Sequence, residues 1–134
     1  MWQYMRTLTK PYTVLGDQRW KDYTLSADVR IAGGDVELGG RFGDQNRLAY
    51  RWILAKQGGW KLNYQNRILA SGTIAGFDGS AWHSLKLVLC GTAIRGMIDG
   101  RLLVKVKDSS RASGMPYLAS TYDANLFDNV AIEP

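Results

Sequence analysis

The sequence predicts an all-β domain that folds as a two-sheet antiparallel β-sandwich. Apolar and polar residues alternate along most of the chain, turn residues separate the alternating stretches, and no stretch has the period of an amphipathic helix. Strands with one apolar face need a second sheet to cover that face. About ten strands at sandwich-like spacing therefore fit one domain over residues 1–134, with residues 1–10 as its boundary end.

The alternation is clearest over residues 23–31, where one face is apolar and the other carries Thr24, Ser26, Asp28 and Arg30. We expect the polar face to be an ordinary sheet surface. Turn signals follow at Gly58-Gly59 and at Asp99-Gly100, and the second is the stronger hairpin signal because a type I′ turn needs two positive φ angles. The other expected strands lie within residues 33–44, 47–56, 60–65, 81–90, 92–100, 101–108, 115–121 and 126–134.

Aromatic residues in step with leucines indicate the core. Trp52, Trp60 and Tyr64 follow this pattern and are expected to pack inside. We also expect Trp20 and Trp82 to plug the sandwich, and Cys90, in an apolar strand, to be a small buried side chain.

Composition excludes several classes of protein. Hydrophobic residues make up 46% and charged residues 22% of the chain, as is typical of a globular domain. No apolar run approaches the ~20 residues that cross a bilayer, so we expect no membrane span. The net charge of +5 is spread without a nucleic-acid motif, which favours a solvated basic surface over a nucleic-acid partner.

A catalytic site is hard to assemble from this sequence. His83 is the only histidine, and neither a nucleophile elbow nor a set of zinc ligands accompanies it, so we expect it to bond the backbone at a strand entry. Most acidic residues lie in turns, where bonds to the backbone explain them: Asp17, Asp44, Asp78, Asp99 and Asp123. We therefore predict no enzymatic activity, although carboxylate spacing alone does not exclude a glycosidase.

Polar residues opposite the aromatic ones indicate a binding face. Arg51, Lys61 and Asn63 would line the outer face of two adjacent strands, where planar polar groups can bond to sugar hydroxyls. If that face is concave, it is a shallow carbohydrate site.

Four stretches, in this order, resemble the C-terminal lectin-like domain of galactocerebrosidases: "YTVLGDQRWKDYTLSADVRI", "GGRFG", "WHSLKLVLCGTAIRGMIDG" and "LFDNVAIEP". Some of these motifs recur across concanavalin A-like jelly rolls, including laminin G modules. The resemblance implies a jelly roll of two curved sheets that lacks the catalytic (β/α)₈ barrel, so the chain looks like an excised or stand-alone accessory domain. A secreted or lysosome-like compartment would follow if it belongs to a larger glycosidase.

The resemblance also bears on ligands. It implies a non-catalytic domain that binds a galactoside-type glycan or a glycolipid headgroup, with Arg41 of "GGRFG" added to Arg51, Lys61 and Asn63 as candidates. The resemblance implies that Asp128 is similar to an aspartate that holds structural calcium and that the other ligands of that ion come from sequence before residue 1. No cofactor is therefore expected to be required, and calcium stays open as a ligand. The alternatives are a bond from Asp128 to a neighbouring loop and, for the whole chain, a laminin G-like module for sulfated glycan, anionic lipid or protein.

Overall fold

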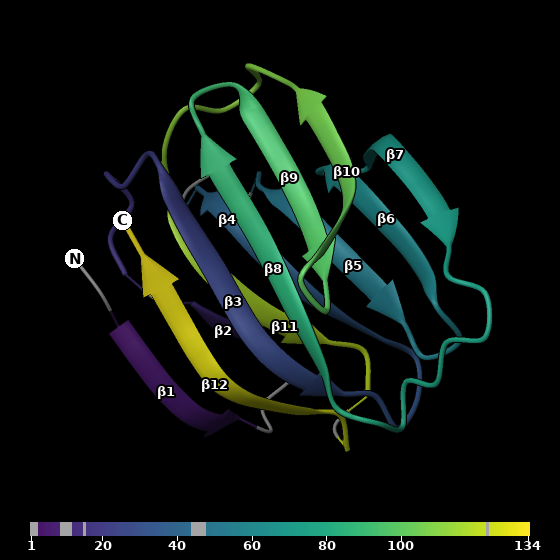
Figure 1. The fold of residues 1–134 in the computed structure, drawn as a ribbon. Coiled ribbons are helices and arrows are strands. Elements are labelled where there is room, and N and C mark those ends of the chain that lie inside the picture. The colour runs from purple at the N-terminus through teal and green to yellow at the C-terminus, as the bar shows by residue number, and fades with distance from the viewer. Residues whose placement is uncertain (1–2, 9–11, 15, 44–47, 123) are drawn as a thin grey trace.

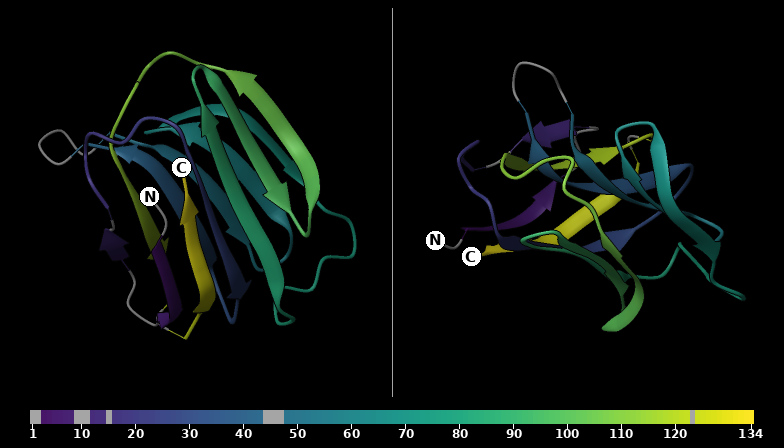
Figure 2. Two further views of the ribbon diagram at one scale, coloured as in Figure 1. Left: turned by 60° about the vertical axis from the view of Figure 1, so that its left-hand side comes forward. Right: turned by 90° about the horizontal axis from the view of Figure 1, so that it is seen from above.

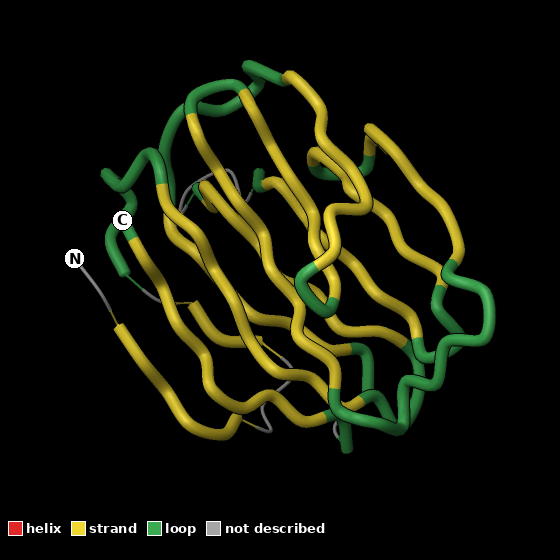
Figure 3. The backbone as a smooth tube through the Cα atoms, viewed as in Figure 1, coloured by secondary structure: helices red, strands yellow, loops and turns green. Residues whose placement is uncertain are grey.

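The computed structural model describes residues 3–8, 12–14, 16–43, 48–122 and 124–134, the first two segments as backbone alone. Within these residues the chain forms twelve strands and no helix, so no helix could cross a membrane (Figure 3). The strands are β1 (Gln3–Leu8), β2 (Tyr12–Val14), β3 (Tyr23–Arg30), β4 (Asp35–Phe42), β5 (Tyr50–Ala55), β6 (Gly59–Tyr64), β7 (Arg67–Thr73), β8 (His83–Cys90), β9 (Ala93–Ile98), β10 (Arg101–Lys107), β11 (Met115–Ser120) and β12 (Leu126–Glu133).

The strands form two antiparallel sheets that pack face to face, which confirms the predicted sandwich (Figures 1 and 2). Among the described residues, each sheet has six strands. Sheet A has the order β1-β12-β3-β8-β9-β10, and sheet B has the order β2-β11-β4-β5-β6-β7. The chain crosses repeatedly between the sheets. Its first and last strands, β1 and β12, pair with each other in sheet A.

The core lies between the sheets and is built by the alternation that the sequence predicts. In β3, residues 23, 25, 27 and 29 are buried, while the intervening residues face outward. Trp52 of sheet B spans the core to Gly96 of sheet A, where a Cβ atom would come within 2.7 Å of the Trp52 ring. Glycine at position 96 therefore makes room for the largest buried side chain.

Both predicted hairpin signals are confirmed. Asp99 and Gly100 have φ angles of 53° and 77° between β9 and β10, as a type I′ turn requires. Gly58, between β5 and β6, has a φ of 96° and lies directly beneath Phe77. Three strands were not predicted: β1, β2 and β7. Residues 1–10, expected to be a boundary end, contain β1, and in β7 the residues Ala70 and Gly72 interrupt the alternation.

Two predictions about individual side chains, that Trp82 plugs the core and that Cys90 is buried, are wrong. Trp82 is 46% exposed because it lies just before β8, where the opposite sheet does not cover it, so its predicted core role is wrong. Cys90 is exposed at the far end of the same strand. Trp20 is partly buried against the core, in agreement with the prediction. Asp44 and Asp123 lie outside the described residues.

Candidate functional site

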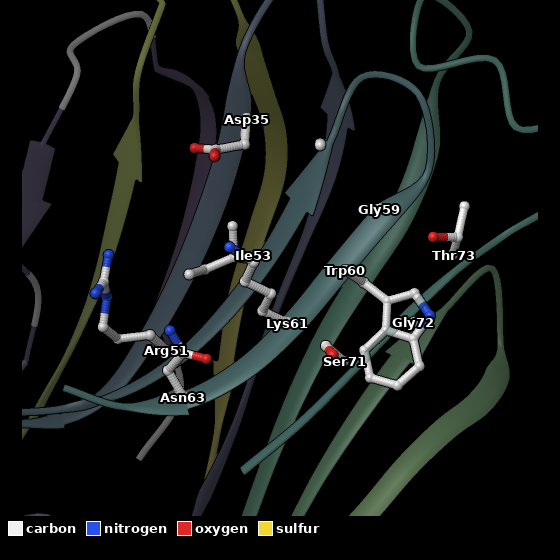
Figure 4. A pocket seen from close by; sticks show the side chains of 11 residues that line it. Asp35, Arg51, Ile53, Gly59, Trp60, Lys61, Asn63, Ser71, Gly72 and Thr73 are labelled. Carbon is white, nitrogen blue, oxygen red and sulfur yellow. The ribbon is translucent and has the colours of Figure 1, made fainter. Parts of the chain in front are cut away.

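A hollow of about 570 Å³ lies on the outer face of sheet B, over β4 to β7 (Figure 4). The strand register aligns its residues in rows across the sheet. The hollow forms where small residues, such as Ala55, Gly59 and Ser71, lie among residues with longer side chains. Two rows across β4 to β7 are Glu37–Ile53–Lys61–Ser71 and Gly39–Arg51–Asn63–Ile68.

The hollow has a floor that is partly apolar and a rim that is polar. Ile53 and Ala55 supply aliphatic surface, while Asp35, Lys61 and Thr73 supply charged and hydroxyl groups. Lys61 is exposed, and no ion pair to it occurs among the described residues. This combination of apolar surface and a few convergent polar groups is typical of small-molecule sites.

Arg51 is held at one end of the hollow by Glu37. Its Nε lies 3.0 Å from Oε2 and its Nη2 lies 2.9 Å from Oε1, while its Nη1 donates to the Gln65 carbonyl at 3.1 Å. These contacts fix the orientation of the guanidinium, and the Arg51 side chain remains 29% exposed. Arg51 is thus oriented by the protein and can still donate to a ligand.

Tyr117 fixes the other side of this ion pair. Its hydroxyl donates to Oε2 of Glu37, and its ring lies over Gly39, where a Cβ atom would overlap it. Burial and the Glu37 carboxylate raise the pKa of Tyr117 well above its usual value, so the hydroxyl remains a donor. The hydrogen bond to Glu37 likewise raises the pKa of Arg51.

Asp35 lies at the opposite end of the hollow, at the start of β4. Burial, followed by the nearby Glu37 carboxylate, raises the pKa of Asp35 above its usual value. The backbone of Asp35 is bonded to Thr121, whose Oγ1 accepts from the Asp35 N–H at 2.9 Å. This contact anchors the end of the hollow to the turn that follows β11.

Asn63 carries the most informative polar group of the hollow. The residue is 6% exposed, and its Oδ1 is buried without a hydrogen-bond partner in the described residues. A buried acceptor left unpaired costs about 1–3 kcal/mol, and such groups are rare in folded proteins. In Figure 4, Asn63 lies beside Arg51, its direct cross-strand neighbour, so an acceptor and a donor are adjacent.

Arg41 does not lie with the other three candidates. It is 1% exposed, and its guanidinium donates to the carbonyls of Lys21, Gly91 and Arg111 and to the Asp22 carboxylate. These partners come from loops that the chain brings together away from the hollow. Its surroundings give Arg41 a structural role, and we leave it out of the candidate site.

Asp128 sits at an irregularity of β12, opposite Asp28 of β3. Its Oδ1 accepts from the backbone N–H of Asn129, which has a φ of 51°, and Asn129 Nδ2 donates to Asp28 at 2.7 Å. One bond of the Asp128 carboxylate is therefore to the adjacent residue. Within the described residues, no group of three or more His, Cys, Asp or Glu side chains gathers here or elsewhere.

His83 bonds the backbone at its strand entry, as predicted, and also bonds a carboxylate that the sequence did not indicate. Its Nε2 lies 2.7 Å from the Asp78 carbonyl, and its Nδ1 lies 2.7 Å from Oδ2 of Asp99. Burial lowers the pKa of His83, but the bonds to Asp99 and Asp78 outweigh it and raise the pKa above its usual value. Both ring nitrogens are engaged, so neither is free to act as a base.

Sequence reasoning missed Asp35, Ser71 and Thr73 as parts of the hollow, and Glu37 as the residue that orients Arg51. They depend on which strands are neighbours, and only the alternation of Asp35, Val36, Glu37 and Leu38 could have placed the two acids on one outer face.

Solved structures share this architecture at low sequence identity. The carbohydrate-binding module CBM66 from Bacillus subtilis matches with a TM-score of 0.76 and 19% identity, over 99% of this chain and 95% of that one. Sheep galectin-11 in complex with glycerol matches with a TM-score of 0.68 and 10% identity, over 93% and 98%. A Bacillus licheniformis β-glucanase matches with a TM-score of 0.59 and 10% identity, over 87% and 67%. The fold is thus a jelly-roll sandwich that lectins, carbohydrate-binding modules and some glycosidases share.

The family can be stated more closely. The family model described as galactocerebrosidase, C-terminal lectin domain, matches residues 1–134, and the chain belongs to this family. It is a lectin-like domain of carbohydrate-binding type, and the laminin G-like alternative is not favoured. Membership of a lectin-domain family also fits a role without catalysis.

Proposed function

We propose that the hollow on the outer face of sheet B binds a galactoside-type glycan or a glycolipid headgroup. The observation that carries the proposal is the buried, unpaired Oδ1 of Asn63 beside the oriented guanidinium of Arg51. Asn63 lines the hollow, so a turn of its amide would bring Oδ1 within reach of a sugar hydroxyl. That hydroxyl could donate to Oδ1 and accept from Arg51, and this pairing would remove the cost of the unpaired acceptor.

The rest of the hollow complements a sugar ring. Ile53 and Ala55 offer aliphatic surface to the C–H face of a ring, while Lys61, Ser71 and Thr73 offer donors to its hydroxyls. The ring of Trp60 packs against Trp52, with centroids 5.5 Å apart, and leans on Gly72. Recognition would therefore rest on hydrogen bonds and aliphatic contact more than on stacking in the hollow itself.

We further propose that the domain is a non-catalytic accessory to a (β/α)₈ barrel encoded elsewhere. The support is membership of a family that is named as the C-terminal lectin domain of galactocerebrosidase. The purified domain should leave a chromogenic galactoside unhydrolysed, and turnover that scales with the amount of domain would contradict the accessory role.

A glycan array read at low and high salt tests the proposed ligand. Binding of neutral galactosides with little salt dependence supports the proposal, because contacts with neutral sugars are not screened. Binding restricted to sulfated glycans and lost at high salt would instead support the interaction-module alternative.

Two matched lysine variants localise the binding. Lys61→Met removes a donor from the rim of the hollow, whereas Lys86→Met removes the same charge from the outer face of sheet A, opposite Ser26. We expect Lys61→Met, and not Lys86→Met, to weaken the binding of neutral galactosides. Equal effects of the two variants would argue against the hollow.

A further inference from the structure

Tyr122 is an exposed aromatic side chain in the turn between β11 and β12. It is 47% exposed, although most large hydrophobic side chains of the described residues are buried or partly buried. One side of its ring lies against Gly33, where a Cβ atom would come within 3.3 Å of the ring. The glycine lets the ring rest on the backbone, so the ring has a support and an accessible surface.

The turn that carries Tyr122 is held by several hydrogen bonds. The hydroxyl of Ser120 donates to the Tyr122 carbonyl at 2.7 Å, and the backbone N–H of Asn125 donates to the same carbonyl at 3.1 Å. The buried side chain of Asn125 accepts from the N–H groups of Ala32 and Gly33 at 2.7 and 3.1 Å. These bonds hold the backbone of Tyr122 and that of Gly33 in place, which lowers the entropic cost of binding.

The same contacts connect Tyr122 to the hollow. Thr121, the residue before it, bonds the backbone of Asp35, and Asp35 lines the hollow. Gly33, which supports the ring, precedes Asp35 by two residues, so their Cα atoms lie within about 7 Å of each other. A ligand that fills the hollow and extends past Asp35 would reach this ring.

We propose that Tyr122 forms a second carbohydrate subsite, on which a second sugar of an oligosaccharide stacks while its first sugar occupies the hollow. The inference rests on the proposed function of the hollow and adds that the preferred ligand has at least two sugar units. An aromatic ring offers a flat apolar surface to the C–H face of a sugar, and the one such ring that lines the hollow, that of Trp60, is partly buried against Trp52. The hollow would select the first sugar by hydrogen bonds, and Tyr122 would raise the affinity for ligands that carry a second sugar.

Calorimetric titration of methyl β-galactoside, a β-linked galactobiose and the corresponding galactotriose tests this subsite. We expect the wild-type domain to bind the disaccharide more tightly than the monosaccharide. Tyr122→Ala should lower the affinity for the disaccharide and the trisaccharide by about three- to tenfold, as expected for the loss of one aromatic contact. Its affinity for methyl β-galactoside should be unchanged. Tyr122→Phe should behave as wild type, because the ring is retained.

Leu102→Ala is the matched control, since Leu102 is equally exposed but lies on β10 of sheet A. It should change none of the three affinities. The subsite is refuted if Tyr122→Ala binds the disaccharide as tightly as wild type, or if the wild type gains nothing from a second sugar while methyl β-galactoside still binds. Failure of all three sugars would instead overturn the proposed function of the hollow, and the subsite with it.

Discussion

Replacing Asn63 by leucine should separate the two consequences of its unpaired acceptor. The substitution removes the buried Oδ1 and keeps a side chain with the same branching and number of heavy atoms on the outer face of β6. An unsatisfied buried acceptor costs about 1–3 kcal/mol, and the slight exposure of Asn63 places its cost at the lower end. Asn63→Leu should therefore raise the free energy of unfolding by about 1 kcal/mol, or the Tm by about 3–5 °C in a domain of this size.

Asn125 provides the matched control, because it is the same residue type, is 1% exposed and has its amide fully engaged. Asn125→Leu leaves the backbone N–H groups of Ala32 and Gly33 and the Gly33 carbonyl without this partner. Three orphaned backbone groups should cost about 3–5 kcal/mol, allowing for partial rescue by water.

Differential scanning calorimetry of the wild type and both variants measures the contrast. The expected result is opposite signs: a small gain for Asn63→Leu and a large loss for Asn125→Leu. Such a gain would mean that Asn63 is retained at the expense of stability, as is common for binding residues. If Asn63→Leu destabilises the domain as much as Asn125→Leu does, Asn63 is a structural residue and the reasoning about the hollow fails.

Three further predictions concern the framework. Tyr23→Phe should lower the free energy of unfolding by about 2–4 kcal/mol, because the buried Tyr23 hydroxyl accepts from the Arg41 N–H at 2.7 Å and donates to the Gly114 carbonyl at 2.9 Å. In thermal melts, the control Tyr64→Phe should leave the free energy of unfolding nearly unchanged. Equal losses of stability in Tyr23→Phe and Tyr64→Phe would contradict the bridging role of the Tyr23 hydroxyl. The raised pKa of His83 contributes stability that is fully present below its ordinary pKa of 6.5 and is lost as the pH rises through the higher folded-state value. The Tm should thus fall over that pH range in the wild type and not in His83→Gln, and a pH-independent difference would refute the assignment. Millimolar calcium added after chelator treatment should leave the Tm unchanged, since Asp128 lies in no acidic cluster of the described residues; a rise of several degrees that Asp128→Ala abolishes would show a calcium site.

The parts of the fold that depend on local pattern were predictable. The period of two in β3 and the Asp-Gly turn after β9 each determine a local conformation, and the structure has both. Trp82 shows the limit of this reasoning, because its exposure depends on whether the opposite sheet reaches the start of β8. Position relative to a distant sheet is not encoded in a window of neighbouring residues.

The two arginine candidates illustrate why the site was harder to predict. Arg41 and Arg51 both lie in strands of sheet B, yet one is enclosed and the other lines the hollow. Arg41 has a φ of 54°, and its backbone lies against Gly114, far away in the sequence. Arg51 takes its orientation from Glu37, its diagonal neighbour across the register. Both environments are set by long-range contacts, so residue type and spacing could not distinguish them.

The central claim is that ligand binds on the outer face of sheet B, and amide chemical-shift mapping tests it most directly. In a titration of the ¹⁵N-labelled domain with methyl β-galactoside, we expect the largest shifts at Arg51, Lys61 and Asn63, with saturation as the sugar is added. The amides of Arg41 and Asp128, which lie outside the hollow, should not move. Saturable shifts confined to sheet A or to the loops around Arg41, with none in β5 and β6, would contradict the account.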